Sequence, residues 1–110
     1  MLYSEIIIIY RKNYFGEMQI TAEKITAFYD LPFGGKESGR FRLSMKLLRQ
    51  LVGRKRLYPE DIQELSRALY ERGFILIDME TFFVVLNTRS FASYRRLNDS
   101  SLNVSGEKPA

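Results

Sequence analysis

The sequence LYPEDIQELSRALYERGFILIDMETFFVVL, residues 57–86, contains in order the signals of a helix, a glycine stop and a β-hairpin. Pro59 stands at the first helical position, where a backbone N–H would have no hydrogen-bond partner within the helix, so proline is tolerated there. Two carboxylates follow it at the positive end of the helix dipole. Gly73 is placed for a left-handed helix end. The runs FILID and TFFVVL are rich in β-branched and aromatic residues around a short polar turn at residues 78–80. We therefore predict a helix that ends at the glycine and leads directly into a hairpin.

Three more elements are predicted upstream of this unit. Residues 5–10, EIIIIY, form a β-branched run without alternation, which is typical of a strand that is apolar on both faces. Thr21 is predicted to cap a short helix over residues 22–30, which ends before a proline. Residues 40–53 are predicted to form a second helix that ends at a glycine. The glycine-rich stretch 33–39 is predicted to be a loop, because its lysine lacks the following Ser or Thr that a phosphate-binding loop requires.

The chain after the hairpin is polar apart from one short stretch. Residues 90–97 are predicted to form a short helix capped by Ser90. The remaining sequence is polar and aperiodic, which is typical of a disordered segment. We therefore predict a single domain over residues 1–97 and a disordered tail over residues 98–110.

The composition restricts the chemistry of the chain. Its 110 residues include no cysteine and no histidine. These absences exclude disulfides and thiolate metal sites and remove the commonest general base and metal ligand. No nucleophile–base pair can be drawn from the other residues, so we expect neither an enzyme nor a metal or cofactor. The N-terminal apolar run is too short for a signal peptide or a membrane span, so we expect a cytoplasmic protein without membrane contact.

Positive charge is concentrated in one part of the sequence. The net charge is +4, and residues 40–56 hold seven basic residues and no acidic residue. In the predicted helix, the spacings of Arg42, Lys46 and Arg49 place these residues on one face. Such a segment favours a polyanionic partner, and its alternative interpretation is a solvated surface that serves solubility alone.

The predicted order of elements resembles the winged helix-turn-helix: three helices followed by a hairpin, with a leading strand that completes a small sheet. The resemblance covers residues 5–88 and includes the junction ERGFILID and the run TFFVVL. It implies an α+β fold with a three-helix core and a small antiparallel sheet built from an N-terminal strand and the C-terminal hairpin. It also implies a DNA-binding transcriptional regulator whose third helix enters the major groove.

Two features depart from the DNA-binding members of that family. The exposed face of the third helix is predicted to carry Glu60, Glu64, Arg67 and Glu71, and the hairpin turn is acidic as well. We therefore expect contacts to duplex DNA that are made mainly with phosphates by other cations. These are Arg42, Lys46, Arg49, Arg54, Lys55 and Arg56 before the third helix, and Arg89, Arg95 and Arg96 after the hairpin. The expectation requires both groups to meet on one outward surface.

The three strand-like runs support a second prediction. EIIIIY, FILI and FFVVL are apolar on both faces, so helices that cover one face of the sheet leave the other face apolar. We expect either a homodimer through this sheet face or coverage by residues 12–19 and the helix around Phe91. A homodimeric protein-interaction module with a winged-helix-like fold and no nucleic-acid binding is therefore the alternative function.

Overall fold

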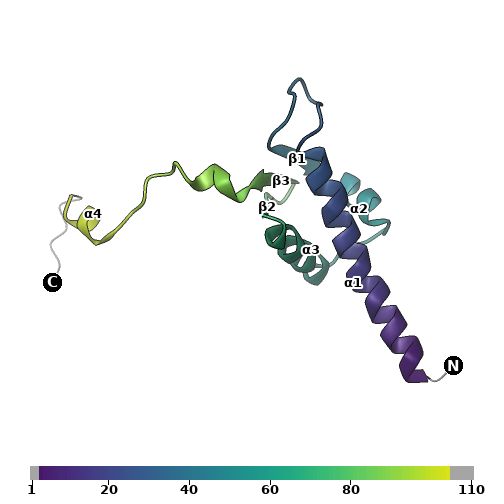
Figure 1. The fold of residues 1–110 in the computed structure, drawn as a ribbon. Helices are drawn as coiled ribbons and strands as arrows, with labels where there is room; N and C mark the ends of the chain where they lie inside the picture. Colours follow the sequence, from purple (N-terminus) through teal and green to yellow (C-terminus); the bar gives the residue numbers. More distant parts are fainter. Residues whose placement is uncertain (1–2, 105–110) are drawn as a thin grey trace.

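The structure is a computed structural model that describes the backbone of residues 3–104 and the side chains of residues 16–103 (Figure 1). Its elements in chain order are α1 (Tyr3–Phe28), β1 (Phe41–Ser44), α2 (Met45–Val52), α3 (Pro59–Glu71), β2 (Phe74–Asp78), β3 (Phe82–Asn87), the 3₁₀ turn η1 (Thr88–Phe91) and α4 (Asp99–Val104). Three longer helices and a three-stranded antiparallel sheet confirm the predicted α+β class. The order of these elements resembles that of a winged helix.

The core lies between the three helices and one face of the sheet. The strand order is β1-β3-β2, and Leu43 of β1 lies opposite Phe83 of β3. The buried apolar residues come from every layer: Met18, Ala22 and Ile25 from α1, Leu48 and Val52 from α2, Leu65, Ala68 and Leu69 from α3, and Leu43, Phe83 and Val85 from the sheet. Each large side chain buried in this way contributes about 1.5–3 kcal/mol to folding.

The unit predicted over residues 57–86 is confirmed. The helix α3 begins at Pro59, and Gly73 follows it with a φ of +86°, the left-handed conformation that glycine adopts without strain. Strands β2 and β3 then form an antiparallel hairpin. Its turn is stabilised by Asp78, whose Oδ1 accepts a hydrogen bond of 2.9 Å from the backbone N–H of Glu80.

The predicted N-terminal strand is wrong. The backbone of residues 5–10 belongs to α1, and the third strand of the sheet is β1 instead. Strand β3 pairs with β2 on one side and with β1 on the other. No position beside β3 therefore remains for a strand from the N-terminus. Thr21 does not cap a helix either, because it is buried within α1 and its Oγ1 donates a hydrogen bond of 2.8 Å to the carbonyl of Glu17.

The helix predicted over residues 40–53 begins later than expected. Residues 41–44 form β1 instead, with Leu43 buried and Arg42 exposed, which is the alternation of a strand. Ser44 then caps α2, because its side chain accepts a hydrogen bond of 3.0 Å from the backbone N–H of Leu47. The predicted end is confirmed, since Gly53 has a φ of +87° and donates its N–H to the carbonyl of Arg49.

The chain beyond the hairpin also differs from the prediction. The turn η1 is capped by Asn87 and not by Ser90, because Asn87 Oδ1 accepts a hydrogen bond of 2.8 Å from the N–H of Arg89. The short helix α4 lies within the sequence predicted to be disordered. Residues 105–110 of that predicted tail lie outside the described part of the chain.

The outer face of the sheet is less exposed than predicted. Ile75, Ile77, Phe82 and Val84 are all half-buried, so the structure does not support a large bare apolar face for a homodimer. The more exposed large apolar residues of the described chain lie on helices and loops, Ile20 and Leu47 among them. None of the helices within residues 3–104 has both the length and the apolarity needed to cross a bilayer.

Candidate functional site

The guanidinium of Arg54 holds three parts of the fold together. Its Nη2 lies 2.9 Å from Oε2 of Glu17 on α1, and its Nη1 lies 3.1 Å from Oδ1 of Asp61 on α3. The other oxygen of Asp61 accepts a hydrogen bond of 2.8 Å from the backbone N–H of Tyr58, at the start of α3. Asp61 is 4% exposed, whereas the side chains of Arg54 and Glu17 are 24% and 29% exposed, so the contact with Asp61 is the more shielded of the two. The guanidinium of Arg54 is therefore engaged within the fold and faces two carboxylates, unlike the other basic side chains predicted to contact phosphates.

The other cations of the first basic segment divide between two elements. Arg42 lies on β1 with its guanidinium 5.5 Å from the ring centre of Phe82, a cation–π distance. The single face predicted for Arg42, Lys46 and Arg49 is wrong, because helical spacing does not extend back past the start of α2. Lys46 and Arg49 do lie together with Lys55 around one shallow hollow of about 410 Å³, which Gln50, Gly53 and Arg54 also line. Arg56 is exposed in the turn that follows.

The second basic group follows the last strand of the sheet. Arg89 is exposed in η1, directly after β3. Arg95 and Arg96 lie on the segment that leads from the body towards α4, on the opposite side of the molecule from α2 (Figure 1). The segment with Arg95 and Arg96 therefore lies apart from α2, whereas the DNA contact predicted from the sequence requires both basic groups on one surface.

The acidic character predicted for α3 and the hairpin turn is present at the surface. Glu60, Arg67 and Glu71 are exposed, whereas Glu64 is half-buried. The turn between β2 and β3 carries exposed Asp78 and Glu80. These carboxylates would repel phosphates, so the structure gives no cationic surface where a winged helix normally meets the major groove.

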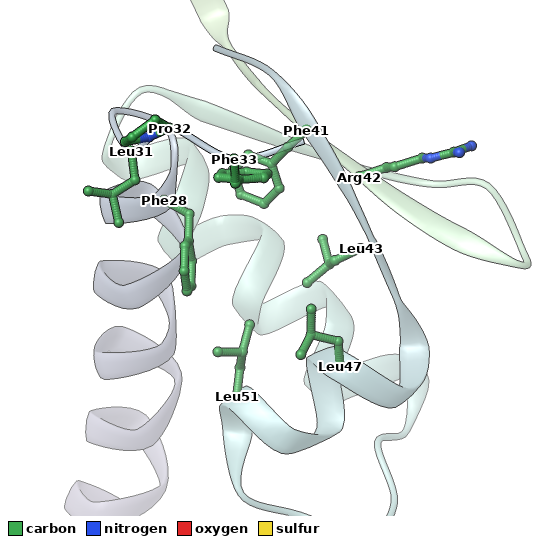
Figure 2. Close-up of a pocket in the computed structure, with 9 residues that line it drawn as sticks. All are labelled: Phe28, Leu31, Pro32, Phe33, Phe41, Arg42, Leu43, Leu47 and Leu51. Carbon is green, nitrogen blue, oxygen red and sulfur yellow. The ribbon is translucent and has the colours of Figure 1, made fainter. Parts of the chain in front are cut away.

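An apolar pocket that the sequence did not predict lies between α1, the loop after it, β1 and α2 (Figure 2). Its volume is about 260 Å³, and its lining residues are Phe28, Leu31, Pro32, Phe33, Phe41, Arg42, Leu43, Leu47 and Leu51. Figure 2 shows the three phenylalanine rings at one part of this space and Leu43, Leu47 and Leu51 at the other, with the Arg42 side chain extending away from it.

Three aromatic rings give the pocket a fixed wall. Phe33 and Phe41 have ring centres 5.4 Å apart, and Phe28 lies 6.3 Å from each of them, all in edge-to-face orientations. Such pairs contribute about 0.5–1.5 kcal/mol beyond their buried area. Nevertheless Phe33 and Leu47 are each 45% exposed, and Leu31 is 48% exposed. Exposed large apolar side chains that gather in one place form the kind of surface on which interaction sites are built.

A second hollow adjoins the apolar pocket. It has a volume of about 410 Å³ and shares Leu31, Phe33, Phe41 and Arg42 with the pocket. Its cationic lining residues are Lys36, Arg40 and Arg42, and no carboxylate is among the residues that line it. An apolar cavity and a cationic one therefore lie side by side. The sequence signal for this site is the group of apolar residues around the glycine-rich stretch 33–39, which on its sequence is predicted only to be a loop.

No protein-family model, no curated protein and no solved structure matches this chain. Within residues 3–104, no cluster of acidic side chains has the composition needed to hold a metal ion. The function must therefore be inferred from the shape and charge of the surfaces described above.

Proposed function

We propose that the chain is a protein-interaction module that binds a partner segment in which an apolar anchor residue is followed by carboxylates. The observation that carries this proposal is the contact between the two cavities, one apolar and one lined by cations, along the edge formed by Leu31, Phe33 and Phe41. In this role the winged-helix-like body positions the two cavities, and α3 does not act as a DNA-recognition helix.

The size of the apolar cavity favours a side chain over a free small molecule. Small-molecule sites measure about 300–1,000 Å³, and the 260 Å³ found here falls below that range. One aromatic or aliphatic side chain presented by a partner helix or strand fills such a space and contributes most of the affinity, as anchor residues do at protein interfaces.

The charge of the adjoining hollow sets the second requirement on the partner. Lys36 and Arg40 are exposed and lie in the loop and at its junction with β1. Carboxylates placed next to the anchor residue would approach both cations, which favours encounter with an acidic segment and disfavours a basic one.

A selection from a random peptide library tests the proposal. The intact chain is immobilised through its C-terminus, and we expect enriched peptides to share an aromatic or aliphatic residue followed by Asp or Glu. Leu47→Glu places a charge in the pocket wall and should abolish enrichment. Lys36→Gln with Arg40→Gln should keep the apolar preference and lose the acidic one, because only the cationic hollow is changed.

The matched control is Tyr70→Glu, which changes another exposed large apolar residue on α3, outside the residues that line either hollow. This variant should enrich the same peptides as the unchanged chain. Enrichment that survives Leu47→Glu, or a library that yields no shared pattern, would contradict the proposed site.

A second candidate function is binding of duplex DNA through phosphates, which the hollow between Lys46, Arg49 and Lys55 favours. If these cations and Arg56 each neutralise one phosphate, affinity should fall by about two decades between 50 and 200 mM salt. Replacing Lys46, Arg49 and Lys55 together by alanine should remove most of that salt dependence. A mobility-shift series that finds no binding at low salt rejects this candidate.

A further inference from the structure

Strand β1 lies at an edge of the sheet, and both hollows of the candidate site reach its main chain. Among the described strands, the order β1-β3-β2 places β1 at one edge, paired with β3. The apolar pocket is lined by Phe41, Arg42 and Leu43, and the cationic hollow by Arg40, Phe41 and Arg42. Side chains of a strand alternate between its two faces, so a cavity lined by three consecutive residues must touch the main chain. In Figure 2 the side chain of Arg42 extends away from the pocket, so its main chain provides the lining.

The hydrogen bonds of the hairpin show which residues of β3 turn their main chain toward β1. The N–H of Met79 donates to the carbonyl of Phe82, and the N–H of Thr88 donates to the carbonyl of Gly73. Hydrogen-bonded and non-hydrogen-bonded pairs alternate along an antiparallel ladder. The even-numbered residues of β3 therefore bond to β2, and the odd-numbered residues bond to β1.

Arg42 consequently presents a main-chain donor and a main-chain acceptor at the edge of the sheet. Phe83 and Val85 lie opposite Leu43 and Phe41, so these two residues of β1 are the ones that bond to β3. The N–H and the C=O of Arg42, which lies between them, point to the other side of the strand. Among the described contacts, neither group of Arg42 has a hydrogen-bond partner. Such an edge is a template on which a further strand can pair.

We propose, on the basis of the function proposed above, that the partner segment binds as an extended strand added antiparallel to this edge of β1. The apolar anchor of the segment lies opposite Leu43. The next residue then lies opposite Arg42 and exchanges two main-chain hydrogen bonds with it. The third residue after the anchor lies opposite Arg40.

The alternation of side chains along the added strand matches the two hollows. The anchor and the second residue after it point to the face of Leu43 and Phe41, which line the apolar pocket. The first and third residues after the anchor point to the opposite face, across from Arg42 and Arg40 of the cationic hollow. Carboxylates at these two positions pair with the guanidinium groups. In a parallel orientation the residues after the anchor would run towards Ser44 and away from both arginines, so the order of anchor and carboxylates selects the antiparallel one.

The other edge of the sheet lacks these features. Strand β2 lies at that edge, and neither of the two hollows has a residue of β2 in its lining. Strand β2 also ends at the exposed Asp78, whose carboxylate would repel an acidic segment. A strand that carries an apolar anchor and carboxylates is therefore expected at β1 and not at β2.

A synthetic hexapeptide tests the added strand on the full, unchanged chain. The probe is acetyl-Thr-Leu-Glu-Val-Glu-Thr-amide, in which leucine is the anchor and the glutamates occupy the first and third positions after it. Titration into the isotope-labelled chain, followed by NMR, should shift the amide signals of residues 40–43 and give the dissociation constant. N-methylation of the first glutamate removes the donor to the Arg42 carbonyl and should weaken binding about tenfold. N-methylation of the valine, whose N–H points away from β1, should leave the affinity unchanged.

Two variants at one position separate the main chain of β1 from its side chain. Arg42→Pro and Arg42→Ala both remove the guanidinium, but only proline removes the outward N–H, which β3 does not use. Proline is tolerated where the N–H of an edge strand faces solvent. The proline variant should therefore bind the probe about tenfold more weakly than the alanine variant. The N-methylated peptides give the same comparison without any change to the fold.

Equal affinities of the unmodified probe and the probe methylated at the first glutamate, with binding that Leu47→Glu abolishes, would overturn the added strand and leave the proposed function in place. The control for direction is acetyl-Thr-Glu-Val-Glu-Leu-Thr-amide, which places the same carboxylates before the anchor. Equal binding of this peptide would overturn the antiparallel orientation. A probe that does not bind at millimolar concentration would overturn the added strand, and the peptide library decides separately whether the pocket takes an anchor.

Discussion

The two basic segments of this chain, residues 40–56 and 89–96, are both rich in arginine or lysine but have different structural surroundings. In residues 40–56, β1, α2 and the following turn hold the cations against the body, and Arg54 is enclosed by two carboxylates. In residues 89–96, the cations follow the last strand and lie exposed on a segment that leaves the body (Figure 1). A run of basic residues therefore does not define a surface by itself, because folding can turn one member into a structural link and leave its neighbours in solvent.

The largest loss of stability is expected when Asp61, the buried carboxylate that pairs with Arg54, is replaced. Asp61→Ala removes an ion pair and the hydrogen bond to the N–H of Tyr58, so it should lower the free energy of unfolding by about 2–4 kcal/mol. Urea denaturation followed by circular dichroism measures this loss. Asp99→Ala in α4 is the matched control and should leave the denaturation midpoint in place; equal effects of the two changes would contradict the structural role of Arg54.

The turn that positions Arg54 should be the next most sensitive feature. Gly53→Val places a β-branched residue at a φ of +87° and should destabilise the fold by about 1–3 kcal/mol. Gly53→Asn should have a smaller effect, because asparagine tolerates the left-handed conformation. Thermal unfolding of both variants measures the difference, and a valine variant as stable as the asparagine variant would mean that the turn has another conformation.

A smaller effect is expected at the beginning of the same segment. Arg42→Ala removes the guanidinium from the ring of Phe82 and should cost about 0.5–1 kcal/mol, the usual value of an exposed cation–π contact. The control is Arg40→Ala, because Arg40 is exposed and has no such aromatic partner among the described contacts. Equal denaturation midpoints for the two variants would show that the ring contact does not contribute to stability.

The smallest effect is expected in the second basic segment. Replacing Arg95 and Arg96 together by alanine should change the free energy of unfolding by less than about 0.5 kcal/mol, since both side chains are exposed and neither makes a described ion pair. The same denaturation series measures it. A loss above that value would show that this segment packs on the body after all.

The parts of the fold that the sequence predicted correctly have strong local signals. Pro59 and Gly73 delimit α3 without help from distant residues, and the hairpin follows directly. Strand β1 was missed because it is only four residues long, and its apolar residues also fit the helical spacing of the sequence that follows. EIIIIY was assigned to a strand from residue type alone, whereas pairing with β3 is a property of the whole sheet.

The candidate site was less predictable because its contacts join distant residues. Arg54 and Glu17 are separated by 37 positions, and no local pattern indicates that these two side chains meet. The apolar pocket likewise combines Phe28 and Leu51, which belong to different helices. The basic residues could be recognised individually in the sequence, but their division between a structural link, a shallow hollow and an outlying segment depends on the tertiary fold.

The two ends of the described chain point in different directions, with the first turns of α1 on one side of the body and α4 on another (Figure 1). A fluorescent label or an affinity handle attached behind α4 is therefore remote from both α1 and the pocket. Attachment to a sensor through the C-terminus consequently leaves the apolar pocket free for measurement.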